Sequence, residues 1–298
     1  MPPGAALDLL VVGDCNPDLL LVGGDPVPEF GQREQLVDRA VLTIGGSASI
    51  TACGATRLGL SAALVAAVGR DHLGDRVLED VSARGVDVST CPRREGDSTG
   101  ITVILARGDD RAILTSVGAI AALTGADIDA GLLRSARHLH IASYFLLHGL
   151  QAGLADLVAA AHAAGVTVSL DPQDDPAGRW ESGLPELVRS VDLLFVNERE
   201  SAGIDTSACP LVVVKRGPRG ALACTPEGEV DHPGVAVAMV DATGAGDSFD
   251  AGFLAAWLDG QPIVDALALA CACGALSTRA PGGTDAQPTL AEARAALA

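Results

Sequence analysis

The 298-residue sequence contains few aromatic residues and few basic ones. Aromatic side chains make up only 3 % of it, so the core must be aliphatic. Its 20 basic residues are outnumbered by 38 acidic residues, and a net charge of -18 repels nucleic-acid phosphates and anionic lipid surfaces. We therefore expect no nucleic acid and no membrane as partners. A small phosphorylated ligand remains compatible with this charge, because a few backbone amides bind it locally.

Long apolar runs and a regular cysteine framework are also missing. The longest nearly uninterrupted apolar run, 266–276, is about half as long as a membrane span, which needs about 20 residues. The cysteines are odd in number and scattered, which favours reduced thiols over disulfides. The first residues lack the basic segment of a signal peptide. Together these absences predict a soluble, cytoplasmic protein.

Short apolar runs alternate with stretches rich in Ala and Leu. The runs 193–196 and 211–214 are apolar at every position, which is typical of strands covered by helices on both faces. The alternation predicts an α/β fold in three layers around a mostly parallel sheet. The other segments of this pattern are 7–12, 47–58, 63–68, 76–84, 153–164 and 167–170.

Two segments, at about 15–43 and 98–117, interrupt this alternation. Each holds two extended runs without a helix between them, and residues 107–110 have the composition of a hairpin turn. We expect these runs to form a small antiparallel sheet that projects from the main domain. No linker, low-complexity tract or repeat marks a boundary, so residues 1–298 are predicted to form a single domain with this excursion.

Two common nucleotide-binding motifs are excluded. A Walker A loop needs Gly-Lys followed by Ser or Thr, whereas the only lysine, Lys215, is followed by Arg216. The first predicted strand is followed by Gly-Asp-Cys-Asn-Pro-Asp at 13–18, not by the Gly-x-Gly-x-x-Gly of dinucleotide-binding folds. The sequence therefore disfavours both P-loop chemistry and a dinucleotide-dependent oxidoreductase.

The segment Asp-Ala-Thr-Gly-Ala-Gly-Asp at 241–247 precedes a stretch with the pattern of a buried helix. The small residues Gly244, Ala245 and Gly246 leave their backbone amides unencumbered at the positive end of that helix, where anionic oxygens are stabilised. Asp247 would lie beside this anion hole, where it can accept a proton from an attacking hydroxyl. The alternative is an ordinary acidic residue in the first turn of a helix.

This segment resembles the signature Asp-Thr-x-Gly-Ala-Gly-Asp of the ribokinase-like (PfkB-type) carbohydrate kinases, with Ala242 as the one departure. The segment that begins with Gly45 and Gly46 is similar to the di-glycine signature of the family, and 197–200 matches its Asn-x-x-Glu motif. The resemblance covers nearly the whole chain. It implies a ribokinase-like α/β fold with a β lid, which in several relatives supports a homodimer.

The resemblance also implies an activity and its cofactors. The protein would use ATP and Mg²⁺ to phosphorylate a hydroxymethyl group of a sugar or sugar derivative, with Asp247 as the general base. Glu200 would organise Mg²⁺ indirectly. Asp241 and Thr243 match a monovalent-cation site of several relatives, which makes K⁺ a hypothesis. The nucleotide-binding residues implied in this way are Asn197, Glu200, Lys215, Gly217 and Gly220.

The implied substrate pocket departs from the family pattern. Ile50 and Ile120 stand where the family has asparagines, so we expect an apolar wall that disfavours a polyhydroxylated ring such as ribose. Asp171 begins Asp-Pro-Gln instead of the Asp-Pro-Asn of sugar-acid kinases, and the basic residue nearby is missing, which gives an acidic sugar or phosphosugar less support. The substrate-binding residues implied are Asp14, Asn16, Asp18, Gly45, Gly46, Ile50, Ile120 and Asp171.

Several alternatives remain open. The pocket would suit a less hydroxylated sugar or a nucleoside, or a sugar whose hydroxyls are bound through other residues, such as Asp14, Asp18 and Gln173. A nucleoside kinase of the same family is the second candidate. A non-catalytic sensor of sugars or nucleotides is the third, although a sensor has no need for the carboxylate of Asp247.

Overall fold

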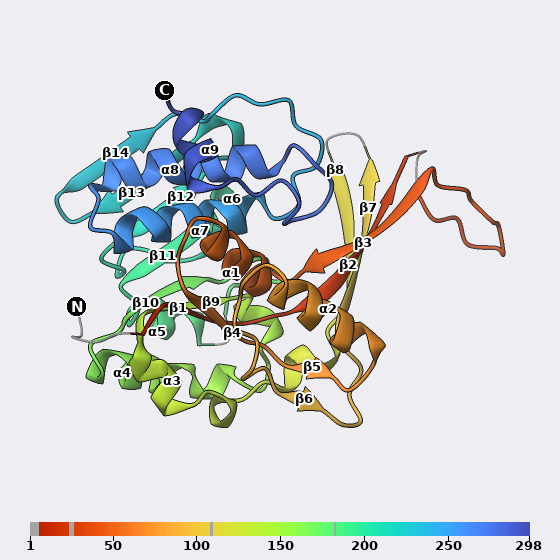
Figure 1. Cartoon of the computed structure of the whole chain (residues 1–298), viewed down its shortest axis with the longest axis horizontal. Helices are drawn as coiled ribbons and strands as arrows, with labels where there is room; N and C mark the ends of the chain where they lie inside the picture. The colour runs from red at the N-terminus through yellow and green to blue at the C-terminus, as the bar shows by residue number, and fades with distance from the viewer. Residues whose placement is uncertain (1–5, 24–26, 108–109, 182) are drawn as a thin grey trace.

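The computed structural model of the chain describes residues 6–23, 27–107, 110–181 and 183–298. An eight-stranded sheet runs through its centre in the order β14-β13-β12-β11-β10-β9-β1-β4 (Figure 1). The strands from β4 to β12 pair in parallel, whereas β13 and β14 form an antiparallel edge. The strands are β1 (Leu7–Val12), β4 (Ala62–Val65), β9 (Ala136–Ala142), β10 (Thr167–Asp171), β11 (Leu193–Asn197), β12 (Val212–Lys215), β13 (Ala221–Thr225) and β14 (Gly228–His232).

Alternate residues of these strands enter two separate hydrophobic cores. Leu9 and Val11 of β1 pack on the side of α1, α2, α7, α8 and α9, whereas Leu10 and Val12 pack on the side of α3, α4 and α5. The predicted three-layer arrangement is therefore confirmed. The helices are α1 (Ser47–Arg57), α2 (His72–Ser82), α3 (Ala130–Ser135), α4 (Leu154–Ala163), α5 (Leu184–Val188), α6 (Glu198–Gly203), α7 (Ala245–Leu258), α8 (Ile263–Ser277) and α9 (Leu290–Ala295).

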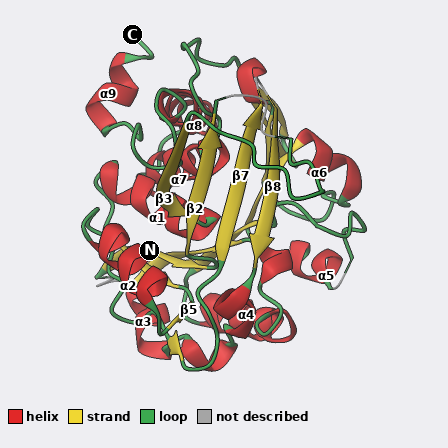
Figure 2. Cartoon of the chain, turned by 90° about the vertical axis from the view of Figure 1, so that its right-hand side faces the viewer, coloured by secondary structure: helices red, strands yellow, loops and turns green. Residues whose placement is uncertain are grey.

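A four-stranded sheet projects from the main sheet and is called the lid sheet below (Figures 1 and 2). It consists of two antiparallel hairpins, as expected, but β2 and β7 pair in parallel, so the sheet is mixed. Figure 2 shows the reason, since the first strands of both hairpins run in the same direction. Residues 108 and 109 of the predicted turn lie outside the described residues. The strands are β2 (Asn16–Val22), β3 (Arg39–Gly45), β7 (Ile101–Arg107) and β8 (Asp110–Ser116); a short parallel pair, β5 (Val68–Gly69) and β6 (Arg93–Arg94), lies apart.

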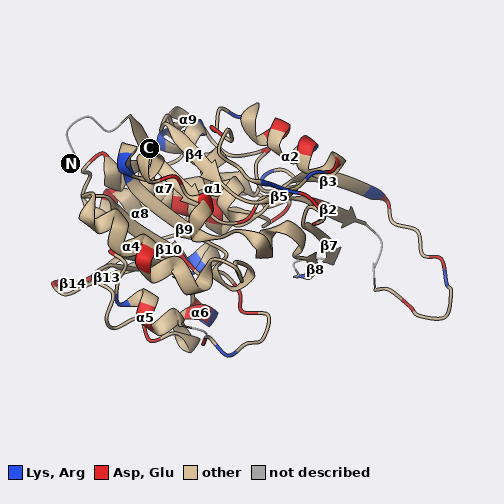
Figure 3. Cartoon of the chain, turned by 90° about the horizontal axis from the view of Figure 1, so that it is seen from below, with Lys and Arg blue, Asp and Glu red and all other residues tan. Residues whose placement is uncertain are grey.

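Two further expectations concern the whole chain. All seven cysteines are free thiols, and all of them except the partly buried Cys224 are buried, which agrees with the absence of a disulfide framework. Among the helices of the described ranges, none is both long and apolar enough to cross a membrane. The acidic excess is visible in Figure 3 on helices such as α2 and α4.

Candidate active site

Polar residues gather where the parallel strands of the main sheet end. Asp14 follows β1, Ser143 follows β9, and Asp171, Asn197 and Lys215 are the last residues of β10, β11 and β12. The carboxyl ends of parallel strands meet at one edge, which is where open α/β sheets bind ligands. This edge is the candidate active site.

The N-terminus of α7 lies where the sequence predicts an anion hole. Gly244 caps the helix with φ 71°, and a Cβ there would come within 2.6 Å of the Gly283 Cα, so the turn requires glycine. The amides of Gly244, Gly246 and Asp247 donate to no group in the described part of the chain. The Ala245 amide, by contrast, donates to the Ala242 carbonyl at 3.3 Å. The sequence predicted that the Ala245 amide is free to bind an anion. This prediction is wrong, because the amide closes the turn before α7.

Asp247 lies in the first turn of α7 and is only 6 % exposed. The Gln173 side-chain amide donates to its Oδ1 at 3.0 Å. Burial raises the pKa of Asp247 to about 8, with a further increase from the negative charge of Asp171 that Lys215 partly opposes. A carboxylate in this setting is a stronger base than one on the surface.

Lys215 is buried instead of lying on an open loop. Its ammonium nitrogen donates to Asp171 Oδ2 at 2.5 Å and to Asp250 Oδ2 at 3.2 Å, and the side chain is 12 % exposed. Burial alone would lower the pKa of Lys215, but these carboxylates raise it above its usual range, so the lysine stays charged. Burial raises the pKa of Asp250 strongly. Burial also acts to raise the pKa of Asp171, but the charge of Lys215 and the hydrogen bonds with Asp250 and Lys215 together lower it. Lys215, predicted to contact the nucleotide, is thus enclosed by two carboxylates.

Asn197 and Glu200 form a capping box at the start of α6. The Asn197 amide nitrogens donate to both oxygens of Glu200, at 2.7 Å from the backbone and 2.6 Å from the side chain. Burial, with the charge of Asp171 added, raises the pKa of Glu200 to about 7. A nearby cation would stabilise the ionised form of this buried carboxylate.

That setting fits an indirect role toward Mg²⁺. No group of three or more His, Cys, Asp or Glu in the ranges given above is arranged to hold a metal ion by itself. Mg²⁺ usually keeps several waters and binds through nucleotide phosphates, so a complete protein site is not needed.

The predicted nucleotide loop follows β12 as a short 3-10 turn, Gly217–Arg219. An ion pair between Arg219 and Glu198 ties it to the start of α6. At Gly220, which has φ 95°, a Cβ would overlap the His232 carbonyl, so this glycine is needed for packing. Nothing lies within 4 Å of a Cβ built at Gly217, which leaves that residue open to a ligand.

Asp14 joins the loop after β1 to the first turn of α1. Its Oδ1 accepts from the Ala48 amide at 3.0 Å, and burial raises its pKa. Gly46, the cap of α1, has φ 88°, and a Cβ there would lie 2.8 Å from the Asp14 carbonyl oxygen. The predicted Asp14 and Gly46 are therefore brought together at a second helix N-terminus of the site.

Asn16, Asp18 and Gly45 meet at the base of the lid sheet. The Asn16 side-chain amide donates to Asp18 Oδ1 at 2.9 Å. A Cβ at Gly45 would overlap the Asp18 carboxylate, so Gly45 makes room for it. Burial and the nearby Asp14 raise the pKa of Asp18 to about 7. These three residues are close together, as predicted.

The prediction that Ile120 and Ile50 form an apolar wall of the substrate pocket is wrong. Ile120 has no exposed surface and belongs to the core beneath the sheet. Ile50 packs behind the anion hole, since a Cβ at Gly244 would lie 3.1 Å from its Cγ2 and one at Gly283 would lie 2.5 Å from its Cδ1. Both isoleucines fill space inside the protein, which sequence position alone does not reveal.

Asp241 closes the loop before α7. Its Oδ1 accepts from the amide of Thr243 at 3.0 Å and from the hydroxyl of Thr243 at 2.8 Å, and its Oδ2 accepts from the Gly282 amide at 2.8 Å. These bonds account for the carboxylate without a cation. The K⁺ site remains a prediction.

Sequence reasoning missed several residues, among them Asp250, which contacts Lys215, and Arg111. Arg111 of β8 reaches the loop before α7, where its Nη1 donates to Thr243 Oγ1 at 3.4 Å. The alternation along the hairpin could have placed it on the same face as Ile113 and Thr115. The sequence did not show that this face turns toward the anion hole.

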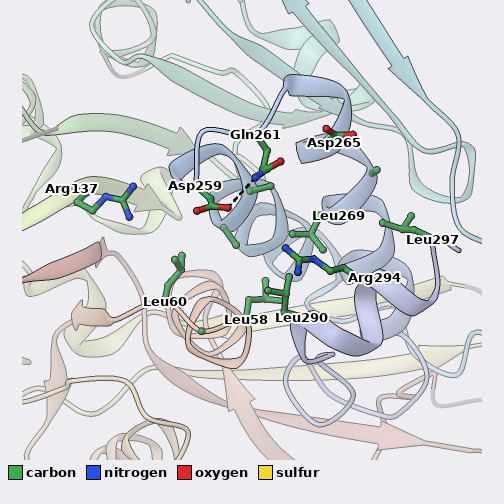
Figure 4. Close-up of a pocket in the computed structure, with 14 residues that line it drawn as sticks. Leu58, Leu60, Arg137, Asp259, Gln261, Asp265, Leu269, Leu290, Arg294 and Leu297 are labelled. Atoms are coloured by element: carbon green, nitrogen blue, oxygen red, sulfur yellow. Dashed lines mark hydrogen bonds between the residues drawn. The ribbon is translucent and has the colours of Figure 1, made fainter.

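A cavity of about 380 Å³ lies away from these residues, at the other end of α7 (Figure 4). Arg137 of β9, Asp259 after α7 and Arg294 of α9 line it. Gln261, which also lines it, donates to Asp259 Oδ2 at 3.0 Å. None of the predicted site residues is among its lining residues.

Comparisons with known proteins show the family of the chain. The model of the pfkB family carbohydrate kinases matches residues 6–290. The ATP-dependent ribose-1-phosphate kinase of Halopiger xanaduensis is 35 % identical over 81 % of this chain and 82 % of that protein. The 2-dehydro-3-deoxygluconokinase of Bacillus subtilis is 30 % identical over 83 % of this chain and 84 % of that protein.

Among solved structures, the adenosine kinase of Sinorhizobium meliloti has a TM-score of 0.86 and 25 % identity, and the match covers 99 % of this chain and 100 % of that one. The family match spans both the main sheet and the lid sheet. The chain therefore belongs to the pfkB family of carbohydrate kinases, ATP-dependent enzymes that phosphorylate small sugar or nucleoside substrates.

Proposed function

We propose that this kinase transfers the γ-phosphoryl group of ATP to a hydroxymethyl group of a sugar, with Asp247 as the general base. The observation that carries the proposal is a buried carboxylate beside the unpartnered amides of Gly244 and Gly246. Amides at a helix N-terminus stabilise the negative charge that develops on the transferred group. The carboxylate accepts the proton of the attacking hydroxyl.

The other residues of the site bind and orient. Asn16 and Asp18, which are hydrogen-bonded to each other at the base of the lid sheet, would bind sugar hydroxyls. Asn197 and Glu200 would hold waters of a magnesium ion, which supplies charge neutralisation between phosphates when bound. Gly217 leaves space for the nucleotide beside α6.

We further propose that the sugar carries an anionic group, because two arginines line a cavity of about 320 Å³ under the lid sheet. Arg39 lies opposite Val22, and Arg111 lies opposite Ala106, and all four line this cavity together with the loop before α7. Guanidinium groups bind carboxylate and phosphate groups strongly and with defined geometry.

This proposal revises the expectation drawn from the missing basic residue near Asp171. The lid sheet supplies basic residues from a distant part of the chain. The two relatives named above act, by their names, on a sugar phosphate and on the salt of a sugar acid. Both kinds of substrate carry the anionic group that Arg39 and Arg111 would bind.

An assay of ATP consumption with Mg²⁺ tests both proposals on one panel of neutral sugars, sugar acids, sugar phosphates and nucleosides, with and without K⁺. We expect the highest kcat/KM for an anionic sugar, with the product phosphorylated at a primary hydroxyl. The sugar acids and sugar phosphates separate the two sources of the charge. Turnover of nucleosides alone would favour the second candidate, a nucleoside kinase, and no turnover at all would overturn the proposal.

The same panel measures the contribution of Arg111. Arg111→Ala should raise the KM for the anionic sugar about tenfold or more, because a charge-assisted hydrogen bond is lost, and should leave the KM for neutral sugars unchanged. The matched control is Arg189→Ala, which removes a surface arginine paired with Glu186. An unchanged KM for every anionic sugar would contradict the role of Arg111.

A further inference from the structure

Gln173 has a backbone conformation that few residues adopt. Its φ is 59°, in the left-handed region that is unfavourable for residues other than glycine. Its own amide donates to Asp171 Oδ1 at 3.1 Å, which forms a tight turn directly after β10. Such strain persists only where surrounding contacts hold the residue in place, and it is common at functional sites.

The side chain of Gln173 joins two carboxylates. Its Nε2 donates to Asp171 Oδ2 at 2.9 Å and to Asp247 Oδ1 at 3.0 Å, so both amide hydrogens are used. The bond to Oδ1 fixes the plane of the Asp247 carboxylate. A glutamine in an unstrained backbone conformation would direct its side chain elsewhere.

Asp171, the anchor of this bridge, is itself held by a buried cation. It is almost fully buried and accepts from Lys215 at 2.5 Å. Lys215 also donates to Asp250, which lies one turn after Asp247 on α7. A continuous chain of contacts therefore runs from the only lysine of the protein through Asp171 and Gln173 to Asp247.

We propose that Gln173 is a positioning residue, which orients the Asp247 carboxylate toward the substrate hydroxyl by bridging it to the Asp171–Lys215 ion pair. The proposal rests on the role of Asp247 proposed above. It assigns a reason to the strained turn at Gln173.

The bridge has an electrostatic consequence. A donor to a carboxylate favours its ionised form, so loss of the Gln173 amide should raise the pKa of Asp247 further. The groups that face Asp247 are Asp14 from the loop after β1 and Asp171 from β10, which oppose its ionisation, and Lys215 and the Ser47 hydroxyl, which favour it. Asp250 of α7 also faces Asp247, and burial raises its own pKa. The negative groups outnumber the positive one, so Asp247 depends on its neutral donors.

Four variants of Gln173 test the proposal. Gln173→Ala should lower kcat about tenfold to 100-fold, leave the KM for ATP within about twofold, and shift the acid limb of kcat/KM to higher pH. Gln173→Glu should shift that limb further, because it adds a negative charge between Asp171 and Asp247. Gln173→Asn, which keeps the donors on a shorter side chain, should recover part of the activity.

Gln173→Gly separates positioning from a purely structural role. Glycine relieves the strained backbone, so this variant should melt at the same temperature as the wild type or higher, yet lose activity as Gln173→Ala does. The control is Gln151→Ala, which removes a side-chain amide that donates to the Tyr144 carbonyl away from the site. A glycine variant with wild-type kcat and pH profile would overturn the proposal.

A failure of the positioning role of Gln173 can be distinguished from a failure of the proposed function. If Asp247→Asn keeps full activity, Asp247 is not the base, and the proposed function fails together with this inference. If Asp247→Asn is inactive while the four Gln173 variants keep the wild-type kcat and pH profile, only the positioning role fails.

Discussion

Burial changes the acid–base behaviour of individual carboxyl groups at this site. Burial raises the pKa of Asp18 and of Glu200 to about 7 and that of Asp247 to about 8. Each of these groups therefore changes charge near neutral pH, where a surface carboxylate is already ionised. Lys215 is the buried cation among them, and it lies against Asp171 and Asp250.

The raised pKa of Asp247 predicts a pH dependence. A general base acts in its deprotonated form, so kcat/KM should increase with pH from 6 and level off above about 8. Measuring the affinity for MgATP over the same range separates this limb from nucleotide binding. A flat kcat/KM between pH 6 and 9, with unchanged MgATP affinity, would show that the essential base titrates as a surface aspartate does.

At the scale of elements, α7 carries both the proposed anion hole and the proposed base. Its first residues provide unpartnered amides, and its cap Gly244 packs against Gly283 with Ile50 behind it. Only glycine fits at position 244, so the helix begins at the next residue, Ala245.

Two glycines at the two ends of α7 provide a matched test. Both have a positive φ, 71° at Gly244 and 78° at Gly260, but nothing lies within 4 Å of a Cβ built at Gly260. Gly260→Ala should cost about 1–2 kcal/mol of stability from backbone strain and leave turnover unchanged. Gly244→Ala should cost more and abolish most turnover, because its Cβ would displace the loop at Gly283.

Chemical denaturation and initial rates measure both effects. Equal stability losses with equal turnover in the two variants would contradict the packing assigned to the anion-hole loop.

Local patterns in the sequence were sufficient to predict those helices and strands whose formation depends mainly on residues close by in the sequence. The apolar runs predicted β1 at 7–12 with its observed bounds, and the segment 241–247 predicted the buried helix that begins within it, α7, at Ala245. The run at 63–68 was less well predicted, because it divides into β4 and β5.

The remaining features depend on which distant segments meet. Lys215 was expected at the nucleotide, and the sequence did not show that β10 and α7 bring two carboxylates to it. Ile120 was expected at the pocket, but it packs into the core. Arg111 belongs to a hairpin far along the chain from the loop that it contacts. No local pattern encodes these contacts.

At the scale of the whole molecule, a chain with net charge -18 binds a polyanionic nucleotide. Helix N-termini and bound cations near the phosphates therefore determine nucleotide binding. The net charge of the chain mainly affects its solubility and its association with other molecules. The predicted homodimer through the lid sheet remains a prediction. Exposed apolar residues on that sheet, Leu42, Ile113 and Leu114, would be the first to examine.

The proton transfer to Asp247 is the central claim, and one paired measurement tests it most directly. Steady-state kcat and the dissociation constant of MgATP are determined on the same preparation of Asp247→Asn, with Asp259→Asn at the other end of the helix as the control. We predict that Asp247→Asn lowers kcat about 100-fold or more while MgATP binds within about threefold of the wild type. A kcat close to that of the wild type, or a loss of MgATP affinity as large as the loss of kcat, would contradict the account.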